Sequence, residues 1–173
     1  SFKLIELNQK FKFLKKNTFL LDLGASPGGW SQVASKIITS GKILSIDIKK
    51  MEPIQNVKFV NSDIFNQKTK EIIQAFFGKE LDVVISDMAA DTTGNKSLDC
   101  IRTNQLCAEV INLSRKILKK NGVIVSKLFM GEDFLEVKQK AKSLFKDVFF
   151  YKPESSKNES KETYLHCKFL KTL

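Results

Sequence analysis

The chain of 173 residues has little of several residue types on which secreted, zinc-binding and membrane proteins depend. It has three cysteines, which cannot all pair with one another, and none of them stands in a C-x-x-C spacing. A disulfide scaffold and a structural zinc site are therefore excluded, and we expect a reducing, cytoplasmic compartment. No window reaches the roughly 18 consecutive apolar residues of a membrane span, and no charged and then apolar leader opens the chain.

Histidine and arginine are also scarce. The only histidine, His166, lies in a predicted strand with no nucleophile motif near it, so we do not expect a Ser-His-Asp triad. Two arginines stand beside 27 lysines, and the formal net charge is +10. Lysine attracts phosphate as a point charge but is poor at reading base edges. The charge favours a polyanionic partner such as nucleic acid, with lysine-rich coding bias as the alternative explanation.

Helical and strand patterns alternate along the chain, with no internal repeat and no Pro/Gly-rich linker. Length and continuity predict one domain over residues 1–173. The predicted helices cover 2–15, 30–38, 68–77, 100–118 and 133–144. The predicted strands cover 18–23, 42–46, 57–60, 81–86, 123–128, 147–151 and 163–169. Asn121-Gly122 is expected to stop the longest helix.

Strands separated by helices predict a parallel sheet, and the last two strands, joined only by a polar loop, predict an antiparallel edge. The expected fold is therefore α/β, a three-layer α/β/α sandwich with a mostly parallel sheet and an antiparallel terminal strand. In such sheets, ligands bind beyond the carboxyl ends of the strands. The residues that end these strands are four acids and one lysine: Asp22, Asp47, Asp63, Asp87 and Lys127.

The turn after the first strand reads DLGASPGGW over residues 22–30. Its glycines let the backbone approach a ligand, and the helix that follows offers free N–H groups to an anion. Asp47 ends the second strand, where an acid is placed to accept both hydroxyls of an adenosine ribose. The dinucleotide pattern G-x-G-x-x-G is broken, however, and Pro27 stiffens the loop. We therefore expect an adenosine ligand with a carboxylate rather than a diphosphate.

Five segments together resemble the FtsJ/RrmJ family: DLGASPGGWSQ over 22–32, the acid at Asp47, SDMA over 86–89, SKLF over 126–129 and SKETY over 160–164. The resemblance runs from residue 2 to near residue 169 and implies a Rossmann-like, S-adenosylmethionine-dependent methyltransferase that needs no metal. It implies transfer to a ribose 2′-hydroxyl of large-subunit (23S-type) ribosomal RNA, with a uridine in the assembled subunit as the expected target. It further implies a cytoplasmic monomer. The alternative is an enzyme of the same fold that acts on another RNA, such as tRNA.

The resemblance also implies which residues do the chemistry. Its catalytic set falls on Lys3, Asp87, Lys127 and Glu162. Its cofactor contacts fall on Gly28, Trp30, Asp47, Asp63 and Asp87. A lysine ending an apolar strand is unusual even without the resemblance, whereas Lys3 and Glu162 alone would be ordinary surface charges and Trp30 could equally be core.

A ribose hydroxyl is a weak acid that needs a positioned base or a cation to react. We expect Lys127 to orient and deprotonate this hydroxyl with help from Lys3, while the two carboxylates hold the lysines. Phosphate contacts near the entrance are expected from a set of lysines: Lys3, Lys10, Lys12, Lys157 and Lys161.

The sequence departs from the family pattern at two places. Ala90-Asp91 follows SDMA where the family has proline, and we expect a looser loop beside the substrate. The family's basic arm before the first catalytic lysine has no counterpart in these residues, so RNA affinity judged from them is expected to be an underestimate.

Three other functions compete with an RNA methyltransferase. A small-molecule or protein methyltransferase is opposed by the lysine pair and the +10 charge. An NAD-dependent oxidoreductase is opposed by the broken glycine pattern and the antiparallel terminal strands. A non-catalytic RNA-binding module is opposed by the intact set of polar residues.

Overall fold

A computed structural model describes residues 1–131, 133–156 and 161–172. Lys157 and Ser160, which the sequence analysis singled out, lie outside these ranges. The strands are β1 (Phe19–Leu23), β2 (Lys42–Asp47), β3 (Lys58–Asn61), β4 (Leu81–Ser86), β5 (Leu118–Phe129), β6 (Phe145–Tyr151) and β7 (Glu162–Leu170). The helices are α1 (Phe2–Phe11), α2 (Gly29–Ile37), α3 (Gln67–Phe77), α4 (Lys96–Ile117) and α5 (Phe134–Leu144), with a short 3₁₀ turn at Glu154–Ser156.

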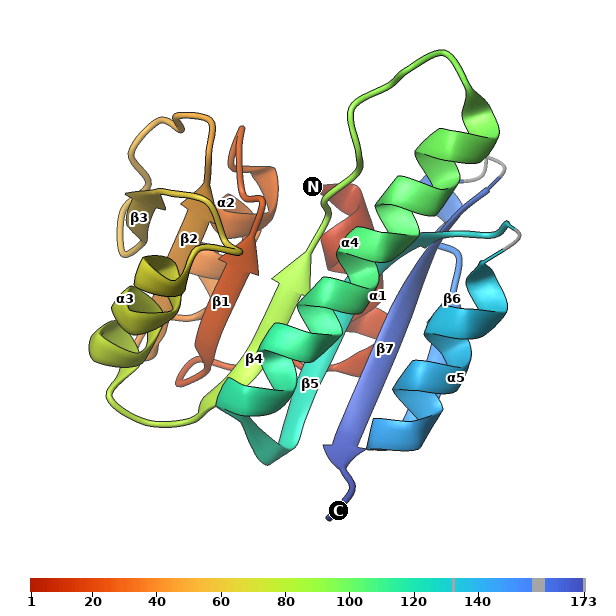
Figure 1. The fold of residues 1–173 in the computed structure, drawn as a ribbon. Coiled ribbons are helices and arrows are strands. Elements are labelled where there is room, and N and C mark those ends of the chain that lie inside the picture. The colour runs from red at the N-terminus through yellow and green to blue at the C-terminus, as the bar shows by residue number, and fades with distance from the viewer. Residues whose placement is uncertain (132, 157–160, 173) are drawn as a thin grey trace.

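The strands form one sheet in the order β3-β2-β1-β4-β5-β7-β6 (Figure 1). Neighbouring strands from β3 to β5 run parallel, and β7 is antiparallel to both β5 and β6. The predicted parallel sheet with an antiparallel terminal strand is confirmed. The sequence pattern did not show that β7 inserts between β5 and β6, which brings the start of β7 beside the end of β5.

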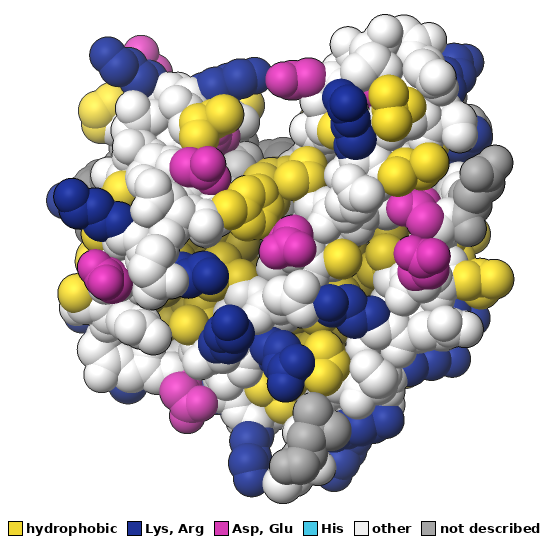
Figure 2. Space-filling model, viewed as in Figure 1, with side chains coloured by type: hydrophobic (Ala, Val, Ile, Leu, Met, Phe, Trp, Pro, Cys, Tyr) yellow, Lys and Arg dark blue, Asp and Glu magenta, His cyan; other side chains and the backbone are white. Residues whose placement is uncertain are grey.

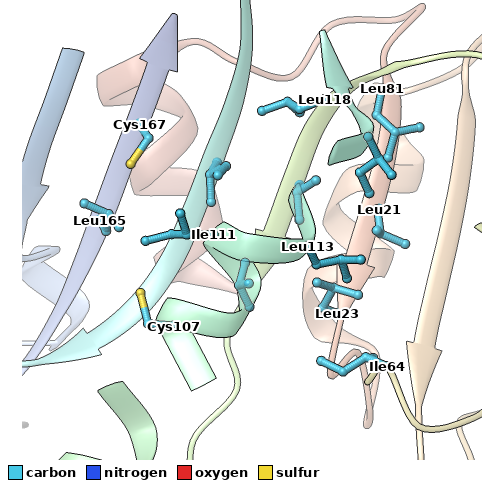
Figure 3. Close-up of a cluster of buried hydrophobic side chains, with 14 of the residues drawn as sticks. Leu21, Leu23, Ile64, Leu81, Cys107, Ile111, Leu113, Leu118, Leu165 and Cys167 are labelled. Carbon is cyan, nitrogen blue, oxygen red and sulfur yellow. The ribbon is translucent and has the colours of Figure 1, made fainter. Parts of the chain in front are cut away.

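Helices cover both faces of the sheet, which makes the predicted three layers (Figure 1). On one face, Leu4 and Leu7 of α1 and Trp30 of α2 pack on apolar side chains of β1, β2, β4 and β5. The other face packs against α3, α4 and α5, with Cys107 and Ile111 of α4 near its centre (Figure 3). Both faces are largely apolar, as expected for a parallel sheet covered by helices, and a few polar side chains such as Asp22 and Ser45 are buried among them.

Two helix boundaries differ from the prediction. Helix α1 ends at Phe11 because Lys12 adopts a left-handed conformation with φ 53°. Helix α4 begins at Lys96 rather than residue 100, since the side chain of Asn95 accepts the N–H of Leu98 at 3.1 Å and caps the first turn.

The prediction that Asn121-Gly122 stops a helix is wrong. Helix α4 ends at Ile117, and both residues lie within β5. The pairing of β4 with β5 steps from Leu81↔Leu118 to Val83↔Val123, so β5 carries extra residues in a bulge. A Cβ at position 122 would overlap the side chain of Leu118, so this bulge requires a glycine there.

The carboxyl ends of the parallel strands meet at the upper edge of the sheet in Figure 1. Strand order reverses between β1 and β4, the place where sheets of this kind bind ligands. Within the described ranges, no helix is long and apolar enough to cross a membrane.

Candidate active site

A groove of about 350 Å³ lies beyond the carboxyl ends of β1, β2 and β4. Figure 2 shows it as a notch at the top of the molecule, between the loops that follow β2 and β3 and the segment that leads into α4. Four carboxylates line it, those of Asp47, Asp63, Asp87 and Asp91. Its volume suits a small organic ligand, and its polar lining suits hydroxyl and amino groups.

The glycine loop after β1 forms one wall of the groove. Gly24 has φ 70°, and a Cβ there would overlap the side chain of Met88. The end of β1 and the loop after β4 can therefore lie this close together only because residue 24 is a glycine. The N–H groups of Gly24 and Ala25 both donate to the carbonyl of Ile46, at 2.8 and 3.1 Å. These bonds fix the loop beside the end of β2.

Asp47 holds this loop in place through its carboxylate. The backbone N–H of Ser26 donates to Oδ2 at 2.8 Å and that of Lys49 to Oδ1 at 2.9 Å. Each carboxylate oxygen has more than one lone pair, so Asp47 can still accept the hydroxyls of a ribose in the groove. Asp63 lines the same groove and accepts the N–H of Phe65 at 2.9 Å. These acceptors fit the ribose and adenine of an adenosine cofactor.

Gly28 and Trp30 lie apart from these acids. Neither is among the described residues that line the groove. Gly28 has φ 121° and faces the side chains of Met51 and Ile54. Trp30 is buried, with its ring 5.6 Å from that of Tyr164. Their proposed contacts with the cofactor remain predictions, and the indole of Trp30 serves the core.

Four charged side chains that are far apart in the sequence meet at the edge of the groove. The ammonium of Lys3 lies 2.7 Å from Oε1 of Glu162. The ammonium of Lys127 lies 3.4 Å from Oδ1 of Asp87 and 3.6 Å from Oε2 of Glu162. The structure therefore brings together all four residues of the predicted catalytic set, on α1, the end of β5, the end of β4 and the start of β7.

Burial makes this cluster unusual. The Lys127 side chain is 12% exposed and that of Glu162 is 3% exposed, so the lysine is held by carboxylates rather than by water. Burial raises the pKa of Asp87, against the lowering effect of the Lys127 ammonium and the Tyr164 hydroxyl. Because Asp87 also lines the groove, this carboxylate connects the cluster to the cofactor region.

Tyr164 belongs to the site although the sequence analysis gave it no role. Its hydroxyl lies 2.6 Å from Oδ1 of Asp87 and 3.0 Å from Oε1 of Glu162, and it can donate to one of them at a time. Burial raises the pKa of this phenol, and the two carboxylates raise it further, so the hydroxyl stays protonated. Its spacing of two from Glu162 places both on the same face of β7, a signal that was present in the sequence.

A buried acid lies beneath the glycine loop. Asp22 on β1 accepts the hydroxyl of Ser31 on α2 at 2.6 Å, and the Ser31 oxygen lies 2.6 Å from that of Ser45 on β2. Burial raises the pKa of Asp22 to about 7, opposed by the Ser31 hydrogen bond. This chain of side chains ties three elements together directly below the loop.

Two further expectations are corrected by the geometry. The N–H of Ala90 donates to Oγ1 of Thr103 on α4 at 3.0 Å, a bond that a proline could not make, so the loop after SDMA is anchored rather than loosened there. Lys12 does not lie near the entrance, because α1 runs from the site to the opposite end of the sheet. Lys10 lies over the ring of Tyr151, 5.9 Å from its centroid, and Lys161 is exposed.

Known proteins resemble this chain over almost its whole length. The family model described as FtsJ-like methyltransferase matches residues 1–170. "Ribosomal RNA large subunit methyltransferase E" of Pelagibacter ubique is 46% identical over 171 residues, which cover 99% of this chain and 84% of that protein. The protein of the same description from Rickettsia akari is 44% identical, with 95% of this chain and 75% of that protein covered.

Solved structures agree with the sequence relatives. A crystal structure of a ribosomal RNA methyltransferase from Plasmodium falciparum has a TM-score of 0.86 and 31% identity, and the match covers 98% of this chain and 95% of that chain. A Streptococcus mutans protein in complex with SAH has a TM-score of 0.59, with 96% of this chain and 97% of that chain covered. At 17% identity, this second likeness shows the fold alone.

Proposed function

Because the chain belongs to the FtsJ-like methyltransferase family, we propose that it methylates a ribose 2′-hydroxyl of large-subunit ribosomal RNA. It is an S-adenosylmethionine-dependent methyltransferase with a Rossmann-like fold. The observation that carries the proposal is the meeting of Lys3, Asp87, Lys127 and Glu162 at the edge of the groove. Two lysines and two carboxylates suit proton transfer from a hydroxyl, and the relatives of this chain are described by their action on ribosomal RNA.

The cofactor is held by residues of the groove. We assign the ribose hydroxyls to Asp47 and the adenine to the region of Asp63, with the loop that contains Gly28 beside the remainder of the ligand. Asp87 lines the groove at the catalytic cluster and is assigned to the positive end of the cofactor. Bound S-adenosylmethionine supplies an electrophilic methyl group on its sulfonium.

Methyl transfer forms a bond from the ribose oxygen to the methyl carbon, breaks the sulfur–carbon bond and releases the hydroxyl proton. The lysine that takes this proton is a free amine before the step and an ammonium after it, and we assign this role to Lys127, which contacts the reacting hydroxyl. Lys3 adds positive charge beside the developing oxyanion. Glu162 positions both lysines, since one of its oxygens faces each ammonium. Tyr164 holds the carboxylates at a fixed separation through its hydroxyl.

The finer points of the proposal concern the setting of the reaction. We propose a uridine in the assembled large subunit as the target, and the cytoplasm as the compartment in which that substrate is met. Residues 1–173 act as one methyltransferase domain. One chain supplies all four charged residues of the cluster, which supports a monomer as the active form.

The proposal is tested by methylating RNA with S-adenosylmethionine that carries a labelled methyl group. The acceptors are unmethylated large ribosomal subunits, protein-free rRNA, tRNA and a short single-stranded RNA, each digested afterwards to nucleosides. We expect labelled 2′-O-methyluridine, most of it from the large subunits. Label on a base, label in tRNA alone, or no transfer to any of the four acceptors contradicts the proposal.

A further inference from the structure

A second hollow, of about 250 Å³, opens at the amino end of the sheet, opposite the cofactor groove. Five lysines line it, and they come from the loop after α1, the loop before β4, the bulge of β5 and strand β7: Lys12, Lys15, Lys79, Lys119 and Lys168. We call it the amino-end hollow. Lysines from four separate segments gather at one place, which a compositional bias alone does not require.

Among the described residues that line the amino-end hollow, the one carboxylate, that of Asp82, is already engaged. Oδ2 of Asp82 accepts the backbone N–H of Phe19 at 2.8 Å, and Oδ1 pairs with the ammonium of Lys119 at 2.9 Å. Within the described ranges, no carboxylate forms a salt bridge with the other four lysines. Four positive charges in one concavity repel one another and attract an anion.

Aromatic contacts hold part of this charge in place. The Lys79 ammonium lies 4.4 Å from the centre of the Phe19 ring, and that of Lys168 lies 4.9 Å from the centre of the Phe169 ring. Such cation–π contacts fix an ammonium without neutralising it. Figure 2 shows Lys and Arg side chains over the lower part of the face, towards the amino ends of the strands in Figure 1.

The cofactor groove has the opposite character, since four carboxylates and only one lysine, Lys49, are among the described residues that line it. An enzyme that acts on RNA gains little phosphate attraction from such a groove and needs positive charge elsewhere. A strand of five or six residues spans roughly 16–20 Å, so the amino-end hollow is about that far from the catalytic cluster. An anion held there is therefore a different part of the substrate from the reacting ribose.

We propose that the amino-end hollow binds the phosphate backbone of ribosomal RNA at a point remote from the methylated nucleotide. This inference rests on the proposed function, because it takes the substrate to be an RNA large enough to reach both ends of the sheet. Under this proposal, efficient methylation requires folded or assembled RNA, because a short oligonucleotide in the active site cannot also contact the hollow.

The test compares two triple variants with equal reduction of charge. The first replaces three exposed lysines of the hollow, Lys12→Gln, Lys15→Gln and Lys79→Gln, and leaves the Lys119–Asp82 pair intact. The control replaces three lysines on α2 and α5, Lys36→Gln, Lys138→Gln and Lys142→Gln. A third protein carries arginine at positions 12, 15 and 79, which preserves the charge. Thermal melting and calorimetric affinity for S-adenosylhomocysteine show that each protein is folded with its cofactor groove intact.

The measurements are kcat and KM on large ribosomal subunits, and RNA affinity as a function of salt concentration. For the hollow variant we expect KM to rise about tenfold or more with kcat unchanged. The slope of log affinity against log salt concentration should fall by about 0.7–0.9 for each phosphate that the variant no longer binds. The control and the arginine variant should match the wild type. A short RNA that contains the target nucleotide should be methylated equally by all four proteins.

Several results overturn the inference. Equally weakened RNA binding in both glutamine variants shows diffuse surface charge, and unchanged binding in both shows that the hollow binds no RNA. A changed sedimentation coefficient with unchanged RNA affinity shows that a second copy of the chain is the occupant. If the wild type methylates no ribosomal RNA, the proposed function fails instead, and the RNA-binding comparison between the two triple variants still decides whether the hollow holds phosphate.

Discussion

The two ends of the sheet differ in the burial and pairing of their charged side chains. At the carboxyl end, acids and two lysines are brought into contact and largely buried, with Lys127 between Asp87 and Glu162. At the amino end, five lysines from separate segments line one hollow, and in the described part of the chain the one carboxylate there, Asp82, pairs with Lys119 and leaves the other four lysines without a salt bridge. Paired and buried charges suit chemistry, because their positions are fixed and their protonation is tuned. Unpaired and hydrated charges suit reversible attraction to a polyanion.

Strand β5 allows the two ends of the sheet to be compared within one element, because it carries Lys120 near its start and Lys127 near its end. Lys127→Ala removes the proposed base and should lower single-turnover methylation by roughly 100-fold or more. Lys127→Arg should fail nearly as badly, since a guanidinium stays protonated and is larger. Rapid-quench measurement at saturating cofactor and substrate reports this rate.

The matched control is Lys120→Ala, which removes an exposed lysine at the other end of the same strand. It should leave the single-turnover rate unchanged. Affinity for S-adenosylhomocysteine should survive in both variants, since neither lysine lines the cofactor groove in the described part of the chain. Near-normal turnover by Lys127→Ala would move the role of base to Asp87.

Asp47 tests whether the carboxyl end holds the cofactor. Asp47→Ala removes an acceptor for the ribose and releases the backbone N–H groups of Ser26 and Lys49. We expect S-adenosylmethionine affinity to weaken by roughly 1.5–3 kcal/mol, as for hydrogen bonds to a charged group. Isothermal titration calorimetry measures it, and Asp99→Ala, an acid outside the groove, is the control. Unchanged affinity, or a requirement for a divalent ion, is incompatible with this assignment.

The buried acid at the carboxyl end should make stability depend on pH. Burial raises the pKa of Asp22 to about 7, so between about pH 4 and pH 7 the native state keeps a proton that the unfolded chain releases. The contribution of Asp22 to stability therefore falls as pH rises through this window. Between about pH 5.5 and 7.0 the fall is at most about 2 kcal/mol, at ~1.4 kcal/mol per unit.

Urea unfolding of wild type and Asp22→Asn at these two pH values isolates this effect. Burial lowers the pKa of His166 to about 4, which favours stability as pH rises, but this influence is common to both proteins. Asp82→Asn, at the other end of the sheet, alters the partly buried pair with Lys119 and should change stability by about 1 kcal/mol. The same pH dependence in wild type and Asp22→Asn contradicts the assignment.

The carboxyl end of the sheet was largely predictable from the sequence. Apolar strand runs ending in Asp22, Asp47, Asp87 and Lys127 predict a shared edge, because parallel strands present their ends together. The four-residue catalytic set came from the resemblance, since nothing in local pattern joins Lys3 to Glu162. Their contact depends on β7 inserting between β5 and β6, a choice of tertiary pairing that periodicity does not encode.

The amino end was not predictable in the same way. The lysines of the hollow are separated by up to 156 residues, between Lys12 and Lys168, and each reads as an ordinary surface charge. Lys12 was assigned to the entrance because the direction of α1 relative to the sheet cannot be read from its amphipathic pattern. The sequence pattern at Asn121-Gly122 predicted a helix end where the structure has a bulge, because a glycine is typical both of the residue after a helix and of a bulge in a strand.

Mapping ribose methylation along large-subunit RNA is the most direct test of the central claim, that the carboxyl end transfers a methyl group to a ribose hydroxyl. Unmethylated subunits are treated with wild type or with Lys127→Ala, and the RNA is digested and sequenced by mass spectrometry. The account predicts one new 2′-O-methyl group at a single nucleotide with the wild type, and its absence with the variant under single-turnover conditions. A methyl group on a base, or an equal yield from both proteins, would contradict it.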